Sequence, residues 1–474
     1  MKKPRSTFPW RSCLKALAAI AVPIALQNLL TTTASMVDTM MVAPLGQLSV
    51  GAIGLCAQFS GLMFSCYWGF VGGGSLFFAQ YWGSREHDGI ERSYGLTLCF
   101  LMTVAVIFSG LALLAPDLVM SLYTDKANIQ QIGIQYLRIV GFAYPLQVLS
   151  MGMSALLRST ERVRIPLVAS SASVSTNLLL NWVFIYGKFG LPAMGVRGAA
   201  LATACAAAVN VLVIYVAAKA SGYPFLFHVR GHFRWTRAHT KAYLIKCFPI
   251  ICNELLIGVG NMVINVTLGR QSEEVIAAIA VFRTLEGLII GFFAGFASAA
   301  SVLVGKCVGA GELETAYQRA KRLVYLCNGV IFAAGMVILA LHEPILTAMS
   351  LSGESLRAGV TLLAIYIFVS LIRMGNWIQN DTYRASGDAV TGTVLEIVFM
   401  YLMVLPAVLI SGFALQAPYW VIFLCCYIVE PLRYVLMQIH LYSGKWVRPV
   451  TDQGLAALPV FREQRARYKV QEKE

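Results

Sequence analysis

Asp38 is a single carboxylate within a long apolar stretch, and no Lys or Arg lies within helical reach of it. An ionisable side chain at the centre of a bilayer costs about 2.5 to 3.5 kcal/mol on insertion scales, so its presence needs a reason. Asn177 and Asn181 are spaced i, i+4 and therefore share one face of a helix. Thr203 adds a hydroxyl in the next apolar stretch. These four polar side chains are candidates for a common site.

A carboxylate, two amide carbonyls and a hydroxyl are hard oxygen ligands, which replace hydration water around hard cations. Sodium fits this description. Burial without a partner charge also disfavours the ionised carboxylate, so a proton could bind at Asp38 instead. A purely structural role remains an alternative, in which the two Asn side chains join neighbouring helices by hydrogen bonds.

The C-terminal half carries a second group of polar residues in apolar stretches: Glu254, Arg283, Glu286, Arg373, Asn376, Glu430 and Arg433. Residues three apart on a helix are neighbours, so Arg283 is expected to pair with Glu286. By the same spacing, Glu430 is expected to pair with Arg433. Arg373 lies midway along its stretch, and we expect it to pair with Glu254 or with Glu286.

Long apolar stretches must position these residues. The chain has 474 residues, of which 58% are hydrophobic and only 13% are charged, unlike soluble domains. Twelve stretches are long enough to cross a hydrocarbon core of ~30 Å. Their approximate spans are 16–43, 51–82, 93–115, 132–157, 165–187, 197–219, 240–268, 276–305, 319–341, 356–383, 391–413 and 418–443. Because they are continuously apolar rather than alternating, they predict an all-α integral membrane protein.

The net charge of +14 could indicate a nucleic-acid partner, but the position of the charges argues against one. If the N-terminus is cytoplasmic, most of the 37 Lys and Arg fall in segments on the cytoplasmic side. This is the positive-inside pattern. We therefore expect a multi-pass protein of the inner (plasma) membrane with both termini cytoplasmic and no nucleic-acid partner.

The chain repeats itself at an offset of 226 residues. This offset relates Gly69 to Gly295, Gly83 to Gly309 and Arg158 to Arg384. Six stretches in each half give both halves the same orientation, so the repeat is parallel, with its axis along the membrane normal. We expect an N-lobe over 1–219, a cytoplasmic linker over 220–239, a C-lobe over 240–443 and a basic cytoplasmic tail over 444–474. Two pseudo-symmetric six-helix bundles suit alternating access by rocking.

Pro23 and Pro249 are equivalent positions of the repeat, near the cytoplasmic ends of the first and seventh stretches. Each proline removes one backbone hydrogen bond from its helix. Either the prolines produce a fixed kink for packing, or they act as hinges that bend during transport.

The chain resembles the multidrug and toxic compound extrusion family from about Leu14 to Tyr442. The motifs that carry the resemblance are MVDTMMVAPLG, LLRSTERVRIP, TNLLLNWVFIYGKFGLPAMGVRGAALAT and VLVGKCVGAGE. The resemblance implies a secondary antiporter that exports organic, often cationic, compounds in exchange for sodium ions or protons. It also implies an N-lobe cation site at Asp38, Asn177 and Asn181, with Thr203 as a further member, and a functional glutamate at Glu254.

Within this family, Arg373 with Asn376 stands where some members carry an acidic cation ligand. We expect Glu254, Arg373, Asn376, Glu286 and Arg283 to border the substrate path, and substrate or protons to disturb the Arg373 ion pair. A lipid-linked sugar or polysaccharide flippase of the same superfamily is the closest alternative. It should have a strongly basic cavity, whereas few Lys or Arg lie within these helices.

Other classes of protein fit less well. An integral membrane enzyme should show clustered His, Cys or acidic motifs near a membrane face, and a channel should show a filter sequence. Neither is evident. His228, His232 and His239 lie in the linker, where no metal site is expected. We therefore expect a monomer without cofactor whose partners are small organic molecules, a coupling cation and the bilayer.

Overall fold

The computed structural model describes residues 10–349 and 351–471, and its regular secondary structure is helical throughout that part of the chain. Eleven helical spans are individually long and apolar enough to cross a membrane. Helices α5 (Ala127–Val140) and α6 (Ala143–Ser159), bent by 51° relative to each other, together form a twelfth. This confirms the predicted all-α membrane fold with twelve spans.

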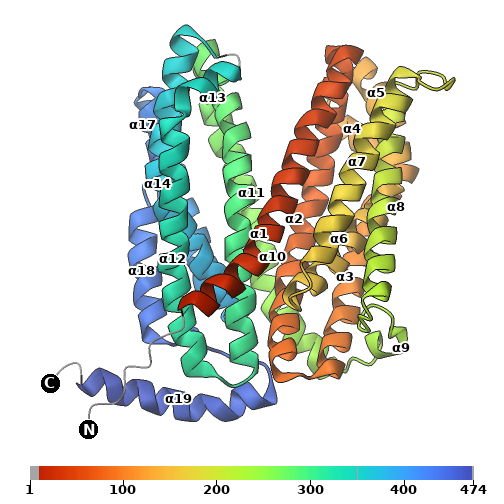
Figure 1. The fold of residues 1–474 in the computed structure, drawn as a ribbon. Helices are drawn as coiled ribbons and strands as arrows, with labels where there is room; N and C mark the ends of the chain where they lie inside the picture. Colours follow the sequence, from red (N-terminus) through yellow and green to blue (C-terminus); the bar gives the residue numbers. More distant parts are fainter. Residues whose placement is uncertain (1–9, 350, 472–474) are drawn as a thin grey trace.

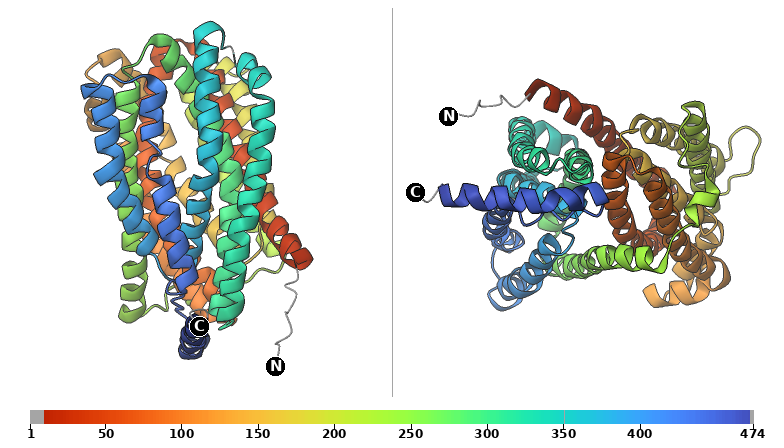
Figure 2. Two further views of the ribbon diagram at one scale, coloured as in Figure 1. Left: turned by 90° about the vertical axis from the view of Figure 1, so that its left-hand side faces the viewer. Right: turned by 90° about the horizontal axis from the view of Figure 1, so that it is seen from below.

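The helices form two bundles that stand side by side (Figure 1; Figure 2). The remaining spans of the first bundle are α1 (Trp10–Val42), α2 (Gln47–Ser84), α3 (His87–Leu114), α7 (Arg164–Tyr186) and α8 (Val196–Ala220). The second bundle begins with α10 (Arg237–Leu268), α11 (Glu273–Gly309), α12 (Leu313–Ala340) and α14 (Gly353–Ala385). It continues with one span made of α15 (Thr391–Phe399), η2 (Met400–Val404), α16 (Leu405–Leu409) and η3 (Ile410–Ala414), and ends with α17 (Tyr419–Cys425) and α18 (Glu430–Ser443). The shorter connecting elements are η1 (Ala43–Leu45), α4 (Pro116–Tyr123), α9 (Val229–His232) and α13 (His342–Ala348), and the last helix is α19 (Asp452–Gln471).

The two bundles meet through pairs of glycines that obey the repeat. A Cβ added to Gly69 of α2 would clash with Ile251, and one added to Gly295 of α11 would clash with Ala25. Because Ala25 and Ile251 are themselves 226 residues apart, these two contacts are equivalent. Such reciprocity is the mark of a two-fold interface, and small residues are what let membrane helices approach closely.

The same reciprocity recurs nearer the end of the molecule that carries both chain ends. Gly83 abuts Lys306, and Gly309 abuts Gln80, which is the repeat equivalent of Lys306. We call this the terminus end; it is the lower end in Figure 1. Toward the opposite end the ribbons of the two bundles diverge (Figure 1). The bundles are therefore joined at the terminus end.

The last segment is more ordered than the expected tail. Trp446 is fully buried, and Phe461 of α19 packs into the core of the second bundle. Helix α19 lies across the terminus end, roughly perpendicular to the bundle (Figure 1; Figure 2). Its length and charge gave no sign of this docking, since the anchoring aromatic side chains are isolated in the sequence.

The linker histidines have separate partners. His228 Nδ1 lies 2.7 Å from Glu91 Oε1, whereas His232 Nε2 lies 2.7 Å from the Phe225 carbonyl oxygen. Within residues 10–349 and 351–471, no group of three His, Cys, Asp or Glu side chains could hold a metal ion. Pro23 and Pro249 lie inside α1 and α10, and their role as hinges stays a prediction.

Candidate functional site

Three helices of the first bundle bring the predicted cation ligands together. Asp38 lies near the end of α1, and Asn177 and Asn181 lie one turn apart on α7. Asn181 Nδ2 donates to Asp38 Oδ1 at 2.6 Å and to Asn177 Oδ1 at 3.2 Å. The two Asn side chains are buried, and Asp38 is partly buried. Asn177 and Asn181 therefore share a face, as their spacing predicted, and this face is turned toward Asp38; a cation-binding role for the three residues stays a prediction.

The amide of Asn177 can face Asp38 in two ways. With its nitrogen toward the carboxylate, it donates to Asp38 Oδ1 at 2.6 Å and to Oδ2 at 3.2 Å. With its oxygen toward the carboxylate, two acceptors face each other, which requires a proton or a cation between them. The buried Oδ1 of Asn181 has no hydrogen-bond partner among the described residues. This oxygen and Asn177 Oδ1 are the amide acceptors available to a positive charge beside Asp38.

Thr203 of α8 lines the same cavity as Asp38 and Asn177. Its hydroxyl donates to the Ala199 carbonyl oxygen at 3.0 Å, so its oxygen can also accept a bond. Tyr136 of α5 lies beside Thr203 and within electrostatic range of Asp38. Sequence reasoning did not identify Tyr136, because a tyrosine in an apolar helix is usually a packing residue.

The cavity in the first bundle has a volume of about 510 Å³. Amide and hydroxyl side chains are the most numerous of its lining residues, and Phe64, Tyr67 and Trp68 add an aromatic wall. At the other end of the cavity, Arg158 Nη2 donates to Gln27 Oε1 at 2.7 Å, and Gln27 Nε2 donates to Ser170 Oγ at 2.7 Å. The sequence identified Arg158 as the repeat equivalent of Arg384. It did not predict that Arg158 lines this cavity, because that position depends on tertiary packing.

In the second bundle, one buried carboxylate holds two arginines. Glu286 of α11 accepts from Arg283 Nη1 at 2.6 Å and from Arg373 Nη1 of α14 at 2.7 Å. Tyr427 donates a longer bond of 3.4 Å to the same carboxylate. The predicted Arg283–Glu286 pair is present, and of the two partners expected for Arg373 the structure has Glu286.

Glu254 of α10 has Arg384 as its cationic partner, whereas the sequence suggested Arg373. Its nearest cationic atom is Arg384 Nη1, at 3.7 Å, and Arg384 also lies 3.9 Å from Asp381. Glu254, Arg283 and Arg373 all line a cavity of about 270 Å³ in the second bundle. The buried Glu286 is not among its lining residues.

The predicted pairing of Glu430 with Arg433 is wrong. The Glu430 carboxylate accepts from Asn376 Nδ2 at 2.7 Å, which places Asn376 against α18 rather than in the cavity lining. Arg433 instead reaches Glu396 of α15, with an N–O distance of 3.3 Å. Glu430 and Arg433 lie in the first turn of α18, inside the bundle. There, side chains on neighbouring helices are better oriented to pair with them than they are to pair with each other.

The terminus end is closed by polar contacts between the bundles. Gln80 of α2 donates to the Ala385 carbonyl oxygen at 2.8 Å and accepts from the Val450 amide at 2.8 Å. Lys306 of α11 pairs with Glu161 of the first bundle at 2.7 Å. Any motion that separates the bundles at this end must break these contacts.

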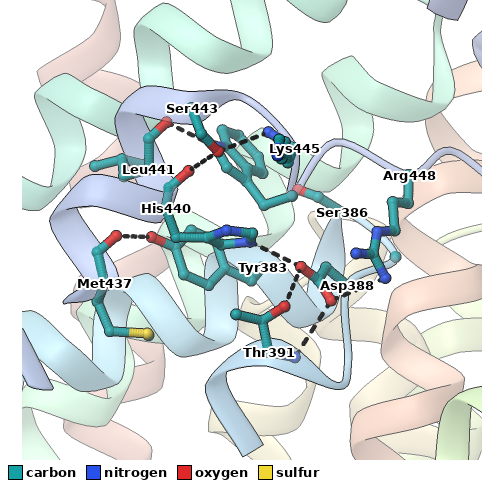
Figure 3. Close-up of polar contacts among 12 residues, drawn as sticks. Tyr383, Ser386, Asp388, Thr391, Met437, His440, Leu441, Ser443, Lys445 and Arg448 are labelled. Atoms are coloured by element: carbon teal, nitrogen blue, oxygen red, sulfur yellow. Dashed lines mark hydrogen bonds and ion pairs between the residues drawn. The ribbon is translucent and has the colours of Figure 1, made fainter. Parts of the chain in front are cut away.

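Asp388, in the turn between α14 and α15, organises this region of the second bundle. Its fully buried carboxylate lies 2.8 Å from His440 Nε2, accepts from Thr391 Oγ1 at 2.8 Å and lies 3.3 Å from Arg448 Nη1 (Figure 3). Burial alone would raise the pKa of Asp388, but the bonds from His440 and Thr391 and the charge of Arg448 outweigh it and lower the pKa. The ionised carboxylate thus ties the chain before α19 to the end of α14.

Comparisons with known proteins agree with this geometry. A family model described as MatE matches residues 23–183 and 249–409, two segments that start 226 residues apart. The probable multidrug resistance protein YoeA of Bacillus subtilis is 24% identical over 394 residues, which cover 82% of this chain and 84% of that protein. The probable multidrug resistance protein NorM of Neisseria meningitidis serogroup A is 24% identical over 386 residues, covering 80% and 82%.

The fold is also that of solved transporters. A structure described as the outward-facing conformation of a multidrug resistance MATE family transporter of the MOP superfamily has a TM-score of 0.80 and 17% identity to this chain. The match covers 91% of this chain and 97% of that one. The family model covers more than half of the chain, and the spans, the repeat and the fold agree with it. The chain therefore belongs to the MatE family of multidrug and toxic compound extrusion transporters.

Proposed function

We propose that this transporter is a secondary antiporter that exports organic, cationic and lipophilic compounds in exchange for Na⁺ or H⁺. The observation that carries the proposal is the Asp38 carboxylate, which lies between two buried amides and borders a cavity. Among the described residues, no Lys or Arg forms an ion pair with it. A carboxylate kept in a membrane helix without a counter-ion is suited to bind a mobile cation.

The amides give the cation site two states. In the empty state, Asn177 and Asn181 donate to the carboxylate and stabilise its charge. When a cation arrives, Asn177 turns its oxygen inward, and the unpartnered Oδ1 of Asn181 completes a set of hard oxygen ligands. A proton at Asp38 would require only the turn of Asn177. The coupling ion and the cationic group of a substrate then compete for the same charge.

The way the bundles are joined supports a proposal of alternating access. We propose that both termini are cytoplasmic and that the protein resides in the plasma membrane as a monomer. The structure then corresponds to an outward-facing state, because the bundles meet at the terminus end and diverge at the other. A rocker-switch motion would break the Gln80 and Lys306 contacts and close the opposite end. Glu254 and Arg373 would form the second-bundle side of the substrate path.

Transport in proteoliposomes tests the proposal. We would measure the efflux of a fluorescent organic cation while the sodium and pH gradients are varied separately. Efflux that follows one gradient would identify the coupling ion, whereas no dependence on either gradient would favour the flippase. Replacement of Asp38 by Asn keeps the hydrogen-bonding shape but removes the charge, so it should abolish gradient-driven efflux while the protein stays folded.

The matched control is Asp117→Asn. Asp117 is an exposed aspartate of α4, with 71% of its side chain accessible, and it is not among the residues that line the cavity. Its variant should transport like the wild type. Full gradient-driven efflux by Asp38→Asn would reject the proposed ion site.

A further inference from the structure

Arg158 is a cation without a counter-ion at the inner end of the first-bundle cavity. Its guanidinium has five N–H donors, and among the described residues the one side-chain acceptor bonded to it is Gln27 Oε1. Its Nε is shielded from solvent and has no acceptor in the described part of the chain. No carboxylate of the described chain forms an ion pair with it. A partly buried cation with unused donors is costly unless an anion reaches it.

The repeat shows what Arg158 lacks. Its equivalent in the second bundle, Arg384, lies beside Glu254 and Asp381, at 3.7 and 3.9 Å. The positions in the first bundle that correspond to these two acids are Asn28 and Ala155. The same arginine is therefore kept in both bundles, but its acidic partners are present in only one.

A third acid of the second bundle is also absent from the first. Glu396 lines the second-bundle cavity beside Arg384, and its repeat equivalent is Ser170, the residue that holds Gln27 against Arg158. Neutral side chains thus replace all three carboxylates around the arginine that both bundles share. Glu396 also pairs with Arg433, whose repeat equivalent is Ala207, so three carboxylates face two arginines in the second bundle. The inner end of the first-bundle cavity is therefore positive where the equivalent part of the second bundle is negative.

The two charges of the first-bundle cavity stand at opposite ends of it. Among its lining residues, Asp38 and Arg158 are the charged ones, and both belong to one continuous cavity. Gln27, which contacts Arg158, and Asp38 are 11 residues apart on α1, so they are ~16 Å apart at ~1.5 Å per residue. A drug-sized molecule can span that distance.

We propose that Arg158 anchors an anionic group of the substrate, so that this cavity binds amphoteric organic compounds. The carboxylate of such a compound pairs with the guanidinium of Arg158, while its cationic group points toward Asp38. Arginine suits this role because its planar fork matches a carboxylate in a bidentate geometry. The inference rests on the proposed export function and specifies its substrate class.

A pair of dyes that differ only in the anionic group tests the inference. One is a rhodamine with a free carboxylate, and the other is the methyl ester of the same dye. Binding to the purified protein is measured by fluorescence anisotropy, and gradient-driven transport is measured in proteoliposomes. Because hydrogen bonds to charged groups are individually strong, Arg158→Gln should weaken binding of the free acid about tenfold or more. Binding of the ester should change less than about twofold.

Two further variants separate charge recognition from structure. Arg158→Lys keeps the charge and should retain part of the preference for the acid. Arg138→Gln alters an exposed arginine, with 61% of its side chain accessible, and should change neither dye. Equal losses for both dyes in Arg158→Gln, or no loss for the acid, would overturn the inference. Failure of the wild type to transport either dye would instead count against the export function, since the binding measurement needs no gradient.

Discussion

Replacement of Glu286 by Gln tests whether one carboxylate neutralises two arginines inside the second bundle. Glu286 has 6% of its side chain exposed and contacts Arg283 at 2.6 Å and Arg373 at 2.7 Å. Glutamine keeps the shape and one acceptor but removes the negative charge. The two guanidinium groups would then repel each other across a site with no other carboxylate bonded to either of them among the described residues.

The size of the effect follows from burial. Removing one partner of a buried ion pair costs about 3 to 5 kcal/mol. Arg283 and Arg373 keep 36% and 29% of their side chains exposed, so solvent screens part of the released charge. We therefore expect a loss of about 2 to 3 kcal/mol in the free energy of unfolding. The assay is SDS-induced unfolding of the purified protein in mixed micelles, followed by tryptophan fluorescence.

A control and a rescue complete the test. Glu463→Gln breaks an exposed pair with Arg467, of which 65% and 76% are accessible, and should leave the stability unchanged. Replacing Glu286, Arg283 and Arg373 together by Leu, Leu and Met should recover most of the loss, because apolar groups of similar volume remove all three charges. If Glu286→Gln is as stable as the Glu463→Gln control, our account of this cluster is wrong.

Two further predictions concern the terminus end. Gly83→Val places a branched side chain where even a Cβ clashes with Lys306, so it should hold the bundles apart and abolish transport. Gly61→Val is the control on the same helix and should remain active, because no other described helix comes within 4 Å of the added Cβ. The lowered pKa of Asp388 means that its stabilisation is present above the unfolded pKa of about 3.9 and is lost as the pH falls through the lower folded pKa. The stability difference between wild type and Asp388→Asn, measured by thermal unfolding in detergent, should therefore be constant from pH 7 to about pH 5 and shrink below about pH 4.

The sequence predicted the membrane spans well because their signal is local. A helix must satisfy its own backbone in lipid, so the length of each apolar run determines where a span can be. The grouping of Asp38 with Asn177 and Asn181 was predictable for a similar reason. Asn177 and Asn181 share a face through helical spacing alone, and a lone carboxylate in lipid requires polar neighbours.

The partners of the second-bundle charges could not be predicted in this way. Helical spacing paired Glu430 with Arg433, but their contacts are with Asn376 and Glu396 on other helices. In a bundle, a long side chain can reach several helices, and the choice depends on helix rotation, which sequence spacing does not determine. The docking of α19 was missed for the same reason, since Trp446 and Phe461 find their pockets only in the assembled fold.

The repeat keeps the same glycines where the two bundles contact each other, whereas the residues that line the two cavities differ. Gly69 and Gly295 make equivalent contacts across the interface, because both sides of a two-fold interface must pack alike. Each cavity lies within its own bundle, so substitution there leaves the interface unchanged. This freedom explains how Arg158 and Arg384 occupy equivalent positions with opposite surroundings. One fold can then present a positive and a negative inner surface to the same central path, which a duplicated site could not do.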